Sequence, residues 1–245
     1  MNKNVAMIIS SFDGYEDLWI PLEQSYKKFW LDCPYKCYVT TNFKKPKFDF
    51  FNYLSVGKDE SWSDMLSKSI RKVEENYILL TFDDLFLYKK IDTNYIQKYI
   101  AYAIDNDLNY LALYPSISDN NKITENIVSK NKNSKYRNAT VWSLWKKEVL
   151  LDLLEKDESA WDFEINGSIR SNKYDKFYCV KTPVIPYTNG VVKGKWKRNA
   201  VKTIENNDIK LDLSRRQIMT LKENIIFNVK DVLYDMYKYI LFLGK

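Results

Sequence analysis

Residues 77–88 read YILLTFDDLFLY, and this segment decides the predicted fold. Its first six residues form an almost wholly apolar run, which is typical of a strand buried on both faces of a parallel sheet. Two adjacent aspartates, Asp83 and Asp84, follow this run directly. Neighbouring carboxylates repel each other and are costly to bury, so their place at the end of a buried strand requires an explanation.

The rest of the chain alternates between similar apolar runs and segments with helical spacing. Ser61, with Asp64 three residues later, and Asp92 are typical residues for the start of a helix. The alternation predicts an α/β sheet with helices on both faces, and no change in composition marks a second domain boundary. Strands are predicted at residues 5–10, 37–41, 50–56, 77–82, 109–114 and 177–185, and helices at 18–30, 61–73, 92–104 and 146–154.

The chain has 245 residues, of which 45% are hydrophobic, so it can bury one large core. Aromatic residues make up 16%, which suits either core filling or grooves where rings stack on a ligand. The net charge is +6, and twelve Lys/Arg against six Asp/Glu after residue 185 account for all of it. This basic end suits phosphates, nucleic acid or an anionic membrane surface, and equally a solvated basic face.

The chain contains no histidine, which excludes Ser–His and Cys–His nucleophile pairs and histidine metal ligands. Its three cysteines, Cys33, Cys37 and Cys179, cannot all pair and are too few for a zinc site. Free thiols and the lack of a secretion signal predict a cytoplasmic protein. No segment has the length of a membrane-spanning helix.

Polar side chains follow the predicted strands at the edge where open α/β sheets bind ligands. They are Ser10, Ser11 and Asp13 after the first strand, residues 40–42 after the second, and Asp83 with Asp84. A divalent cation between the two aspartates would offset their repulsion and bridge to a diphosphate. The alternative is that Asp84 caps a turn while Asp83 meets a lysine, but a surface turn rarely lies between two apolar runs.

The motif WDFE, residues 161–164, combines acids with aromatic rings. Asp162 or Glu164 can act as a general base beside the aromatic platform of Trp161. A helix N-terminus with acids in its first turn explains the same residues structurally. The two interpretations do not exclude each other.

Two polar segments are predicted to be irregular. Residues 119–135, rich in Asn, Lys and Ser, are predicted to form a mobile excursion. Residues 191–197, VVKGKWK, are predicted to form a basic loop hinged at a glycine. Its lysines Lys193 and Lys195 suit phosphate binding, although an ordinary exposed loop has the same composition. No nucleic-acid-binding motif accompanies this short run, so a nucleic-acid partner is not expected.

Six stretches are specific as a set: SSFDGYEDLWIPL, WLDCPYKCYVTTN, GKDESWSDML, YILLTFDDLFLYKKID, SLWKKEVLLDLLEKDESAWDFEINGSIRS and NGVVKGKW. In this order they resemble bacterial glycosyltransferases of surface polysaccharide (capsule and O-antigen) synthesis. The resemblance covers roughly residues 1–213 and implies a GT-A-like, Rossmann-like catalytic domain with a mixed, mostly parallel sheet. It also implies a nucleotide-sugar donor, first of all UDP-linked, and a saccharide or lipid-linked saccharide acceptor.

The resemblance implies roles for individual residues. Asp83 and Asp84 occupy the place of the acidic motif that binds Mn²⁺ or Mg²⁺, although that motif usually reads Asp-any-Asp and here reads Asp-Asp-Leu. Lys193 and Lys195 would replace or supplement the metal at the diphosphate. Glu164, or Asp162, would be the general base, and Trp161 and Trp196 would contact the acceptor. The nucleotide pocket would be lined by Ser10, Ser11, Asp13, Trp62, Ser63, Asp64 and Asp83.

Three functions remain open on this sequence. The favoured one is an inverting glycosyltransferase of the hexosyltransferase type. The second is a retaining transferase on the same scaffold, which would need no general base. The third is a non-catalytic subunit that binds a nucleotide sugar in a polysaccharide assembly complex.

Residues 214–245 are predicted to form a C-terminal amphipathic helical extension. Apolar residues recur there at helical spacing: Ile226, Val229, Leu233, Tyr237 and Ile240. One interpretation places this helix on the inner face of the cell membrane, where lipid-linked acceptors are found. The alternative is a helix packed on the catalytic domain or on a second subunit, as in a homodimer.

Overall fold

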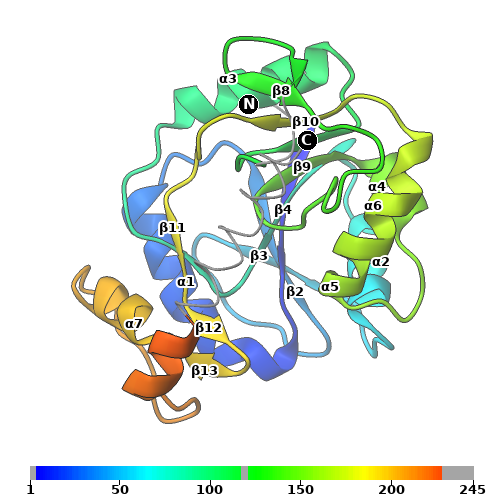
Figure 1. The fold of residues 1–245 in the computed structure, drawn as a ribbon. Coiled ribbons are helices and arrows are strands. Elements are labelled where there is room, and N and C mark those ends of the chain that lie inside the picture. The colour runs from blue at the N-terminus through cyan, green and yellow to red at the C-terminus, as the bar shows by residue number, and fades with distance from the viewer. Residues whose placement is uncertain (1–3, 117–120, 228–245) are drawn as a thin grey trace.

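A nine-stranded mixed sheet forms the centre of the protein (Figure 1), in a computed structural model that describes residues 4–116 and 121–227. In order across the sheet, the strands are β3 (Asn52–Ser55), β2 (Lys36–Thr41), β1 (Val5–Ser10), β4 (Tyr77–Phe82), β9 (Ser143–Lys146), β6 (Tyr110–Ala112), β10 (Phe177–Val180), β8 (Ile127–Ser129) and β7 (Asn121–Lys122). The first four are parallel to one another. Strand β9 is antiparallel to both β4 and β6, and β10 is parallel to β6.

Strands β1 and β4 lie side by side in the middle of the sheet. Their residues are paired from Val5 with Tyr77 to Ser10 with Phe82, so the two strands end at the same edge. Alternate residues of β1 belong to two separate hydrophobic clusters, Met7 to one and Ile8 to the other. Both faces of the sheet are therefore covered, which explains why these strands read as continuous apolar runs.

Helices cover both faces of the sheet, as the alternating sequence predicts. Helices α1 (Glu16–Phe29), α3 (Thr93–Asp105) and α7 (Arg198–Glu205) contribute apolar residues to one cluster, and α2 (Trp62–Arg71) with α4 (Lys147–Leu153) to the other. Two predicted caps are confirmed: Ser61 accepts a hydrogen bond from the Asp64 N–H at 3.2 Å, and Asp92 accepts one from the Tyr95 N–H at 3.0 Å. Each such cap contributes about 1 kcal/mol.

A continuous helical segment covers residues 160–173. It consists of α5 (Ala160–Asp162), the π-helix η2 (Phe163–Gly167), α6 (Ser168–Arg170) and the 3-10 helix η3 (Ser171–Lys173). Ser159 and Asp162 form a capping box at its start. The wider π turn re-aims the side chains that follow it, and such turns are frequent at functional sites.

The prediction of an irregular excursion at residues 119–135 is wrong for residues 121–122 and 127–129. Strands β7 and β8 lie there and extend the sheet beyond β10. Ile127 and Val128 are buried against the two hydrophobic clusters, which accounts for their place in the sheet. The polar residues around this short apolar pair concealed the strand from pattern analysis.

The prediction of a loop at residues 191–197 is also wrong, because these residues form a β-hairpin. Strands β12 (Val191–Val192) and β13 (Lys195–Trp196) are antiparallel, and the two residues between them, Lys193 and Gly194, have φ of 51° and 74°. Positive φ at both positions is typical of a type I′ hairpin turn. A second small sheet pairs β5 (Leu85–Leu87), which follows the two aspartates, with β11 (Tyr187–Asn189).

The chain after α7 returns to this hairpin. The Trp196 N–H donates to the Gln217 carbonyl at 3.0 Å, and the Met219 N–H donates to the Trp196 carbonyl at 2.9 Å. Residues 221–227 are helical. The predicted helical positions Val229, Leu233, Tyr237 and Ile240 lie outside the described residues. Within the described part of the chain, no helix combines the length and apolarity needed to cross a membrane.

Candidate active site

The carboxyl ends of β1 and β4 bring Ser11 next to Asp83. The Ser11 hydroxyl donates a short hydrogen bond to the Asp83 carboxylate, and the Trp19 indole N–H donates to the Ser11 hydroxyl at 2.7 Å. Ser11 is tied to the neighbouring strand as well, since its N–H donates to the Thr40 hydroxyl at 2.7 Å. Asp83 is buried, with 4% of its surface exposed. The sequence prediction that these residues meet at one edge of the sheet is confirmed.

Asp83 and Asp84 form the strand-end pair, and both carboxyls hold their protons unusually tightly. Burial raises the pKa of Asp84 to about 7. Burial, and next the charge of Asp84, raise the pKa of Asp83 well above its ordinary value. The ionised pair is therefore unfavourable on its own, and a cation beside it would lower both pKa values.

Asp13 has a different role at the end of β1. Its carboxylate accepts hydrogen bonds from the N–H groups of Asn42 at 2.9 Å, Phe43 at 2.9 Å and Lys44 at 3.1 Å. The Asp13 N–H in turn donates to the Asn42 side-chain carbonyl at 3.2 Å. These bonds lock the loop after β1 to the loop after β2, so Asp13 shapes the edge of the sheet.

The start of α2 contributes an aromatic side chain to the strand ends. The Trp62 indole N–H donates to the Ser10 hydroxyl at 2.9 Å, and its ring stacks on Phe82 at 6.3 Å between centroids. Asp64 is engaged elsewhere, in an ion pair with Lys68 at 2.7 Å. Ser63 is buried and accepts a hydrogen bond from the Glu158 N–H at 3.3 Å. Of these three predicted residues, only Trp62 contacts the ends of the strands directly.

The helical segment 160–173 separates the two candidate bases. Thr140 donates from its N–H and from its hydroxyl to one oxygen of Glu164, both at 2.7 Å, so the Glu164 carboxylate is fixed in orientation. Asp162 points to solvent and is held by Ser159, whose hydrogen bonds lower the pKa of the Asp162 carboxyl. The interpretation of the first-turn acid as a helix cap therefore holds for Asp162.

Tyr187 lies near enough to both Glu164 and Asp84 to be affected by their charges. Burial raises the pKa of the Tyr187 hydroxyl, and the charges of Tyr114, Asp84 and Glu164 raise it further. One half-buried side chain thus lies within the fields of both Asp84 and Glu164, although these residues are 80 positions apart in sequence. This proximity was not predictable from local motifs.

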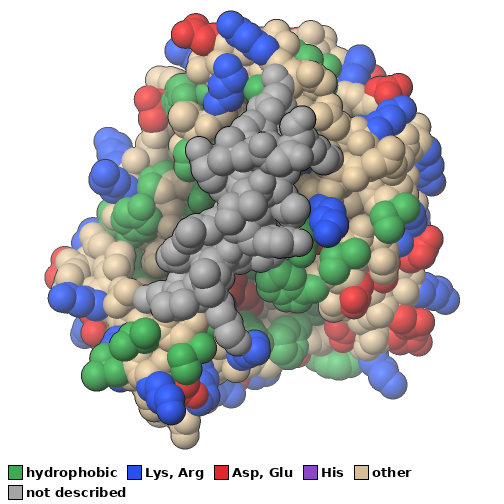
Figure 2. Space-filling model, viewed as in Figure 1, with side chains coloured by type: hydrophobic (Ala, Val, Ile, Leu, Met, Phe, Trp, Pro, Cys, Tyr) green, Lys and Arg blue, Asp and Glu red, His purple; other side chains and the backbone are tan. Residues whose placement is uncertain are grey.

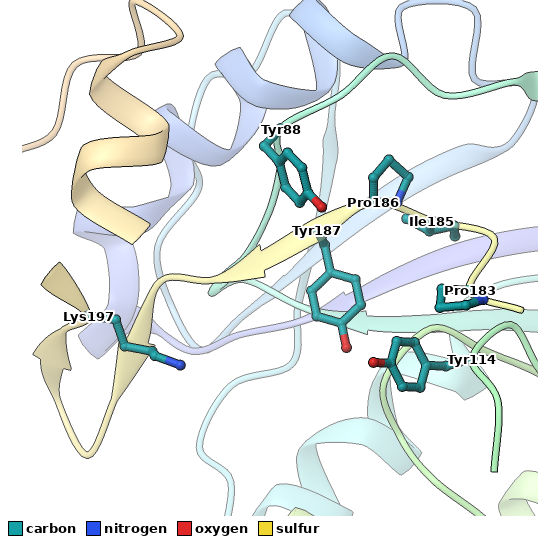
Figure 3. A pocket seen from close by; sticks show the side chains of 7 residues that line it. All are labelled: Tyr88, Tyr114, Pro183, Ile185, Pro186, Tyr187 and Lys197. Carbon is teal, nitrogen blue, oxygen red and sulfur yellow. The ribbon is translucent and has the colours of Figure 1, made fainter. Parts of the chain in front are cut away.

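A cavity of about 520 Å³ lies at Tyr187 (Figure 3). The hydroxyls of Tyr114 and Tyr187 point toward one another across it, with ring centroids 6.2 Å apart. Aromatic and prolyl surfaces of this kind suit the C–H faces of sugar rings, with hydroxyls to fix orientation. The cavity is lined by Tyr88, Tyr114, Pro183, Ile185, Pro186, Tyr187 and Lys197.

The hairpin places its predicted site residues in three different settings. Lys193 is exposed in the turn, whereas Lys195 pairs with Glu223 at 2.6 Å. Trp196 is fully buried and packs on Phe86 at 5.8 Å between ring centroids. The structure therefore places Trp196 in the core and not on an acceptor surface. The other predicted acceptor contact, Trp161, is 72% exposed beside Glu164 in the chain.

The outer surface near the helical segment is shown in space-filling form in Figure 2, where hydrophobic side chains lie among charged ones. On this segment Ile165 and Ile169 are exposed together with Trp161. These side chains recur every four residues, so one side of the segment carries apolar residues toward solvent. Glu164 faces the interior from the same segment. Of the three exposed residues, only Trp161 was predicted from the sequence.

Arg216 is a further residue at the strand ends, and sequence analysis did not identify it. Its guanidinium binds the buried Asp17 carboxylate through two hydrogen bonds of 2.7 and 2.9 Å. It also donates to the Gly14 carbonyl at 3.1 Å and lies 4.0 Å from the centre of the Tyr15 ring. No sequence motif connects residues that are 199 positions apart.

The strand-end pair can bind a divalent cation only if other ligands complete its coordination shell. Within residues 4–116 and 121–227, no three Asp, Glu, Cys or His side chains gather as a metal site. Mg²⁺ in nucleotide sites is typically held by one or two carboxylates, with phosphate oxygens and water completing the shell. Asp84 and Asp83 can supply the two carboxylates, so the fit is to a cation shared with a phosphorylated ligand.

Comparisons with known proteins agree on the fold. No protein-family profile and no curated protein sequence matches the chain. Among solved structures, S. aureus TarS in complex with UDP matches with a TM-score of 0.52 and 11% identity, over 86% of this chain and 67% of that one. The mannosyltransferase PcManGT from Pyrobaculum calidifontis, in complex with GDP-Man and Mn²⁺, matches with a TM-score of 0.52 and 9% identity, over 78% and 58%.

UTP-bound UGPase from Acinetobacter baumannii matches as well, with a TM-score of 0.53 and 10% identity over 95% of this chain and 99% of that one. The chain spans 59% of another TarS structure and 58% of the PcManGT structure. Together the comparisons confirm the predicted class: a mixed, mostly parallel Rossmann-like sheet, as in nucleotide-binding glycosyltransferases and nucleotidyltransferases.

Proposed function

We propose that the chain is a glycosyltransferase that moves a sugar from a nucleotide-sugar donor to a saccharide or lipid-linked saccharide. The observation that carries this proposal is the pair of aspartates at the carboxyl ends of β1 and β4, where Ser11 binds Asp83 and Asp84 follows. Such a pair suits a cation and a diphosphate, and the charges of both Asp84 and Glu164, the carboxylate suited to general-base catalysis, act on Tyr187 in the lining of the cavity. Two neighbours in fold are complexes with UDP and with GDP-Man, which supports a nucleotide-sugar donor.

In the proposed inverting reaction the donor diphosphate lies over the ends of β1 and β4. Glu164, oriented by Thr140, accepts the proton of an acceptor hydroxyl. The hydroxyl oxygen forms a bond to the anomeric carbon while the bond from that carbon to the diphosphate breaks. The electron pair leaves with the nucleoside diphosphate, and the acceptor gains the sugar.

Asp84 and Asp83 are the residues that would hold Mn²⁺ or Mg²⁺. When bound, the cation neutralises part of the diphosphate charge. Ser11 orients Asp83 through its hydroxyl, and the raised pKa values of both carboxyls favour a cationic partner. Lys193, exposed in the hairpin turn, is a further candidate for contact with phosphate.

The acceptor is proposed to bind in the cavity at Tyr187, and the exposed Trp161 is proposed as a further acceptor contact. The aromatic and prolyl lining of the cavity suits a sugar ring of a saccharide or lipid-linked saccharide. We further propose that the donor is a UDP-linked hexose and that the enzyme acts in bacterial capsule or O-antigen synthesis. Its proposed location is the cytoplasm, on the inner face of the membrane. A homodimer formed through residues 214–245 is the alternative to that membrane contact.

A panel of nucleotide sugars tests the proposal. The purified chain is incubated with UDP- and GDP-linked hexoses, a mixture of saccharide acceptors, and Mn²⁺ or EDTA, and release of nucleoside diphosphate is measured. Acceptor-dependent release from at least one donor is expected. The configuration of the product at the anomeric carbon, read by NMR, distinguishes inversion from retention. Binding of a donor without any release would instead favour the non-catalytic subunit.

A nucleotidyltransferase is the second candidate, because the UGPase match spans almost the whole of both chains. Such an enzyme binds a nucleoside triphosphate, whose charge calls for cations at the strand ends. Residues 10–17 here contain three carboxylates, Asp13, Glu16 and Asp17, and no Lys or Arg, and the cations that meet this segment, Arg216, Arg215 and Lys44, are paired with its acids. For this reason the transferase is preferred. Formation of UTP from UDP-glucose and pyrophosphate would contradict that preference.

A further inference from the structure

Arg216 is anchored so rigidly that its guanidinium has one defined direction. Asp17, 1% exposed, binds Nε and Nη2 of Arg216 in a two-bond fork, and Arg216 itself is only 10% exposed. The Gly14 carbonyl accepts a further bond from Nη2, and the Tyr15 ring supports the guanidinium face. The hydrogen bonds to Asp17 and Gly14 hold the Nε and Nη2 side of the group.

The hydrogen bonds to Asp17 and Gly14 use Nε and Nη2, so they leave the N–H groups of Nη1 available to a ligand. Three other cations near this edge are paired: Lys44 and Arg215 with Glu16, and Lys195 with Glu223. Nη1 is thus a donor whose direction is fixed by the bonds of Nε and Nη2.

The backbone ties Arg216 to the strand-end pair. The Gly190 N–H donates to the Asp84 carbonyl at 2.7 Å, and the Lys197 N–H donates to the Gly190 carbonyl at 2.8 Å. The Trp196 backbone forms hydrogen bonds with Gln217 and Met219, which follow Arg216 closely in the chain. Gly190 permits this close packing, because a Cβ there would lie 2.6 Å from the Phe86 ring.

Other contacts place Arg216 at the strand ends. It bonds Gly14 and lies on the Tyr15 ring, both just after β1, and the next residue, Gln217, accepts a hydrogen bond from Trp196. The charge of Arg216 acts on both Asp83 and Asp84, which agrees with this placement.

We propose that Arg216 binds the diphosphate of the nucleotide-sugar donor through Nη1 and stabilises the leaving nucleoside diphosphate. This inference rests on the glycosyltransferase function proposed above. A planar guanidinium that is fixed before the ligand arrives suits phosphate oxygens better than a flexible lysine does. As the bond between the anomeric carbon and the diphosphate breaks, the electron pair stays on a phosphate oxygen, and Arg216 offsets its charge.

The test compares Arg216→Gln and Arg216→Lys with Arg215→Gln in the full chain. Arg215 is the matched control, since it is the adjacent arginine and its partner, Glu16, is also a carboxylate of α1. Donor KM and kcat are measured, together with the affinity for UDP and GDP by thermal shift and calorimetry, with and without Mn²⁺. Arg216→Gln is expected to lower kcat/KM by about 10²–10³-fold, a loss typical of removing one charge-stabilising donor.

Arg216→Gln is also expected to weaken UDP or GDP binding at least tenfold, whereas Arg215→Gln stays within about threefold of wild type. A folded Arg216→Gln variant with wild-type donor kinetics and nucleotide affinity overturns the inference while the transferase function stands. Nucleotide binding that needs Arg216, without turnover of any donor, supports the inference and contradicts the transferase. Absence of nucleotide binding by the wild type overturns both.

Loss of Arg216 leaves the buried Asp17 carboxylate unpaired, which can unfold the chain. The double variant Asp17→Asn/Arg216→Gln removes both charges and keeps a hydrogen-bonding pair. Compared with Asp17→Asn alone, it reports on the arginine without an orphaned carboxylate. Equal nucleotide affinity of these two folded variants overturns the inference, and a loss of tenfold or more in the double variant supports it.

Discussion

The strand-end pair, Asp83 and Asp84, is balanced differently from three acids at the helical segment, here called the helical acids: Glu158 just before the segment, and Asp162 and Glu164 within it. Each helical acid has donors in place: Arg170 for Glu158, Ser159 for Asp162 and Thr140 for Glu164. The strand-end pair has Ser11 and the more distant charge of Arg216, and burial keeps the pKa of both carboxyls high. Acids that are satisfied within the fold stabilise it, whereas the strand-end pair needs a ligand to be stable when ionised.

The largest expected effect is a difference in activity between variants of two helical acids, Glu164 and Asp162. Glu164→Gln removes the proposed base and keeps an acceptor for Thr140, so kcat should fall about 10²–10⁴-fold with little change in donor affinity. Asp162→Asn, two residues away on the solvent side, should cost less than about tenfold, since a single exposed cap contributes about 1 kcal/mol. Steady-state kinetics of both variants measure the difference, and an equal or greater loss in Asp162→Asn would reassign the base.

The second prediction concerns the ion pair that holds the helical segment to its surroundings. Arg170 donates to Glu158 at 2.9 and 2.6 Å and to the Leu153 carbonyl at 2.9 and 2.7 Å. Arg170→Ala leaves the buried Glu158 without its cation and should lower the free energy of unfolding by roughly 3 kcal/mol. Lys173→Ala, which breaks the exposed pair with Asp152, should cost about 0.5 kcal/mol or less.

Urea denaturation of both variants at neutral pH measures this difference. Similar losses for the buried and the exposed pair would show that burial does not govern the stability of this segment.

The third prediction tests whether the strand-end pair opposes folding. The pKa of Asp84 is raised to about 7 in the native state, so the native chain binds this proton more tightly than the unfolded chain. Native stability should therefore fall as the pH rises from about 4 to about 7 in the absence of divalent cations. Asp84→Asn removes this loss and should add roughly 1–3 kcal/mol of stability at pH 8 and little at pH 4.

Asp64 provides a control of opposite sign for this experiment. Lys68 lowers the pKa of the Asp64 carboxyl, so its contribution is present above the unfolded pKa and is lost as the pH falls. Asp64→Asn should be slightly less stable than wild type at pH 8. An Asp84→Asn variant that is less stable than wild type at pH 8 would remove the contrast between the two groups of acids.

The smallest effect concerns the helix start. Ser159→Ala removes the capping box with Asp162 and should cost about 1 kcal/mol of unfolding free energy. Activity should fall only if the loss of this cap changes the orientation of Glu164. Thermal unfolding, with Ser61→Ala at the cap of α2 as a comparison, measures the effect. A loss in Ser159→Ala far above that in Ser61→Ala would mean that the π turn depends on its cap.

Local patterns predicted much of the fold and the position of the strand-end pair. Apolar runs such as β1 and β4, and caps such as Ser61 and Asp92, depend on neighbouring residues, so the sequence displays them directly. Tyr187 and Arg216 could not be found in this way, because their partners are distant in sequence. Trp161 and Trp196 have the same residue type, and only the tertiary packing decides that one is exposed and the other buried.

The hydrogen bond from Gly190 to the Asp84 carbonyl has a consequence for the order of folding. Strands β1 to β4 are complete by residue 82, so the four neighbouring parallel strands of the sheet can pair early during synthesis. The backbone of Asp84 acquires its partner only when residue 190 has been made, and Arg216 follows later still. The framework of the sheet therefore forms before the diphosphate end of the site, and a ribosome-bound chain that stops short of residue 216 carries the strands without a complete site.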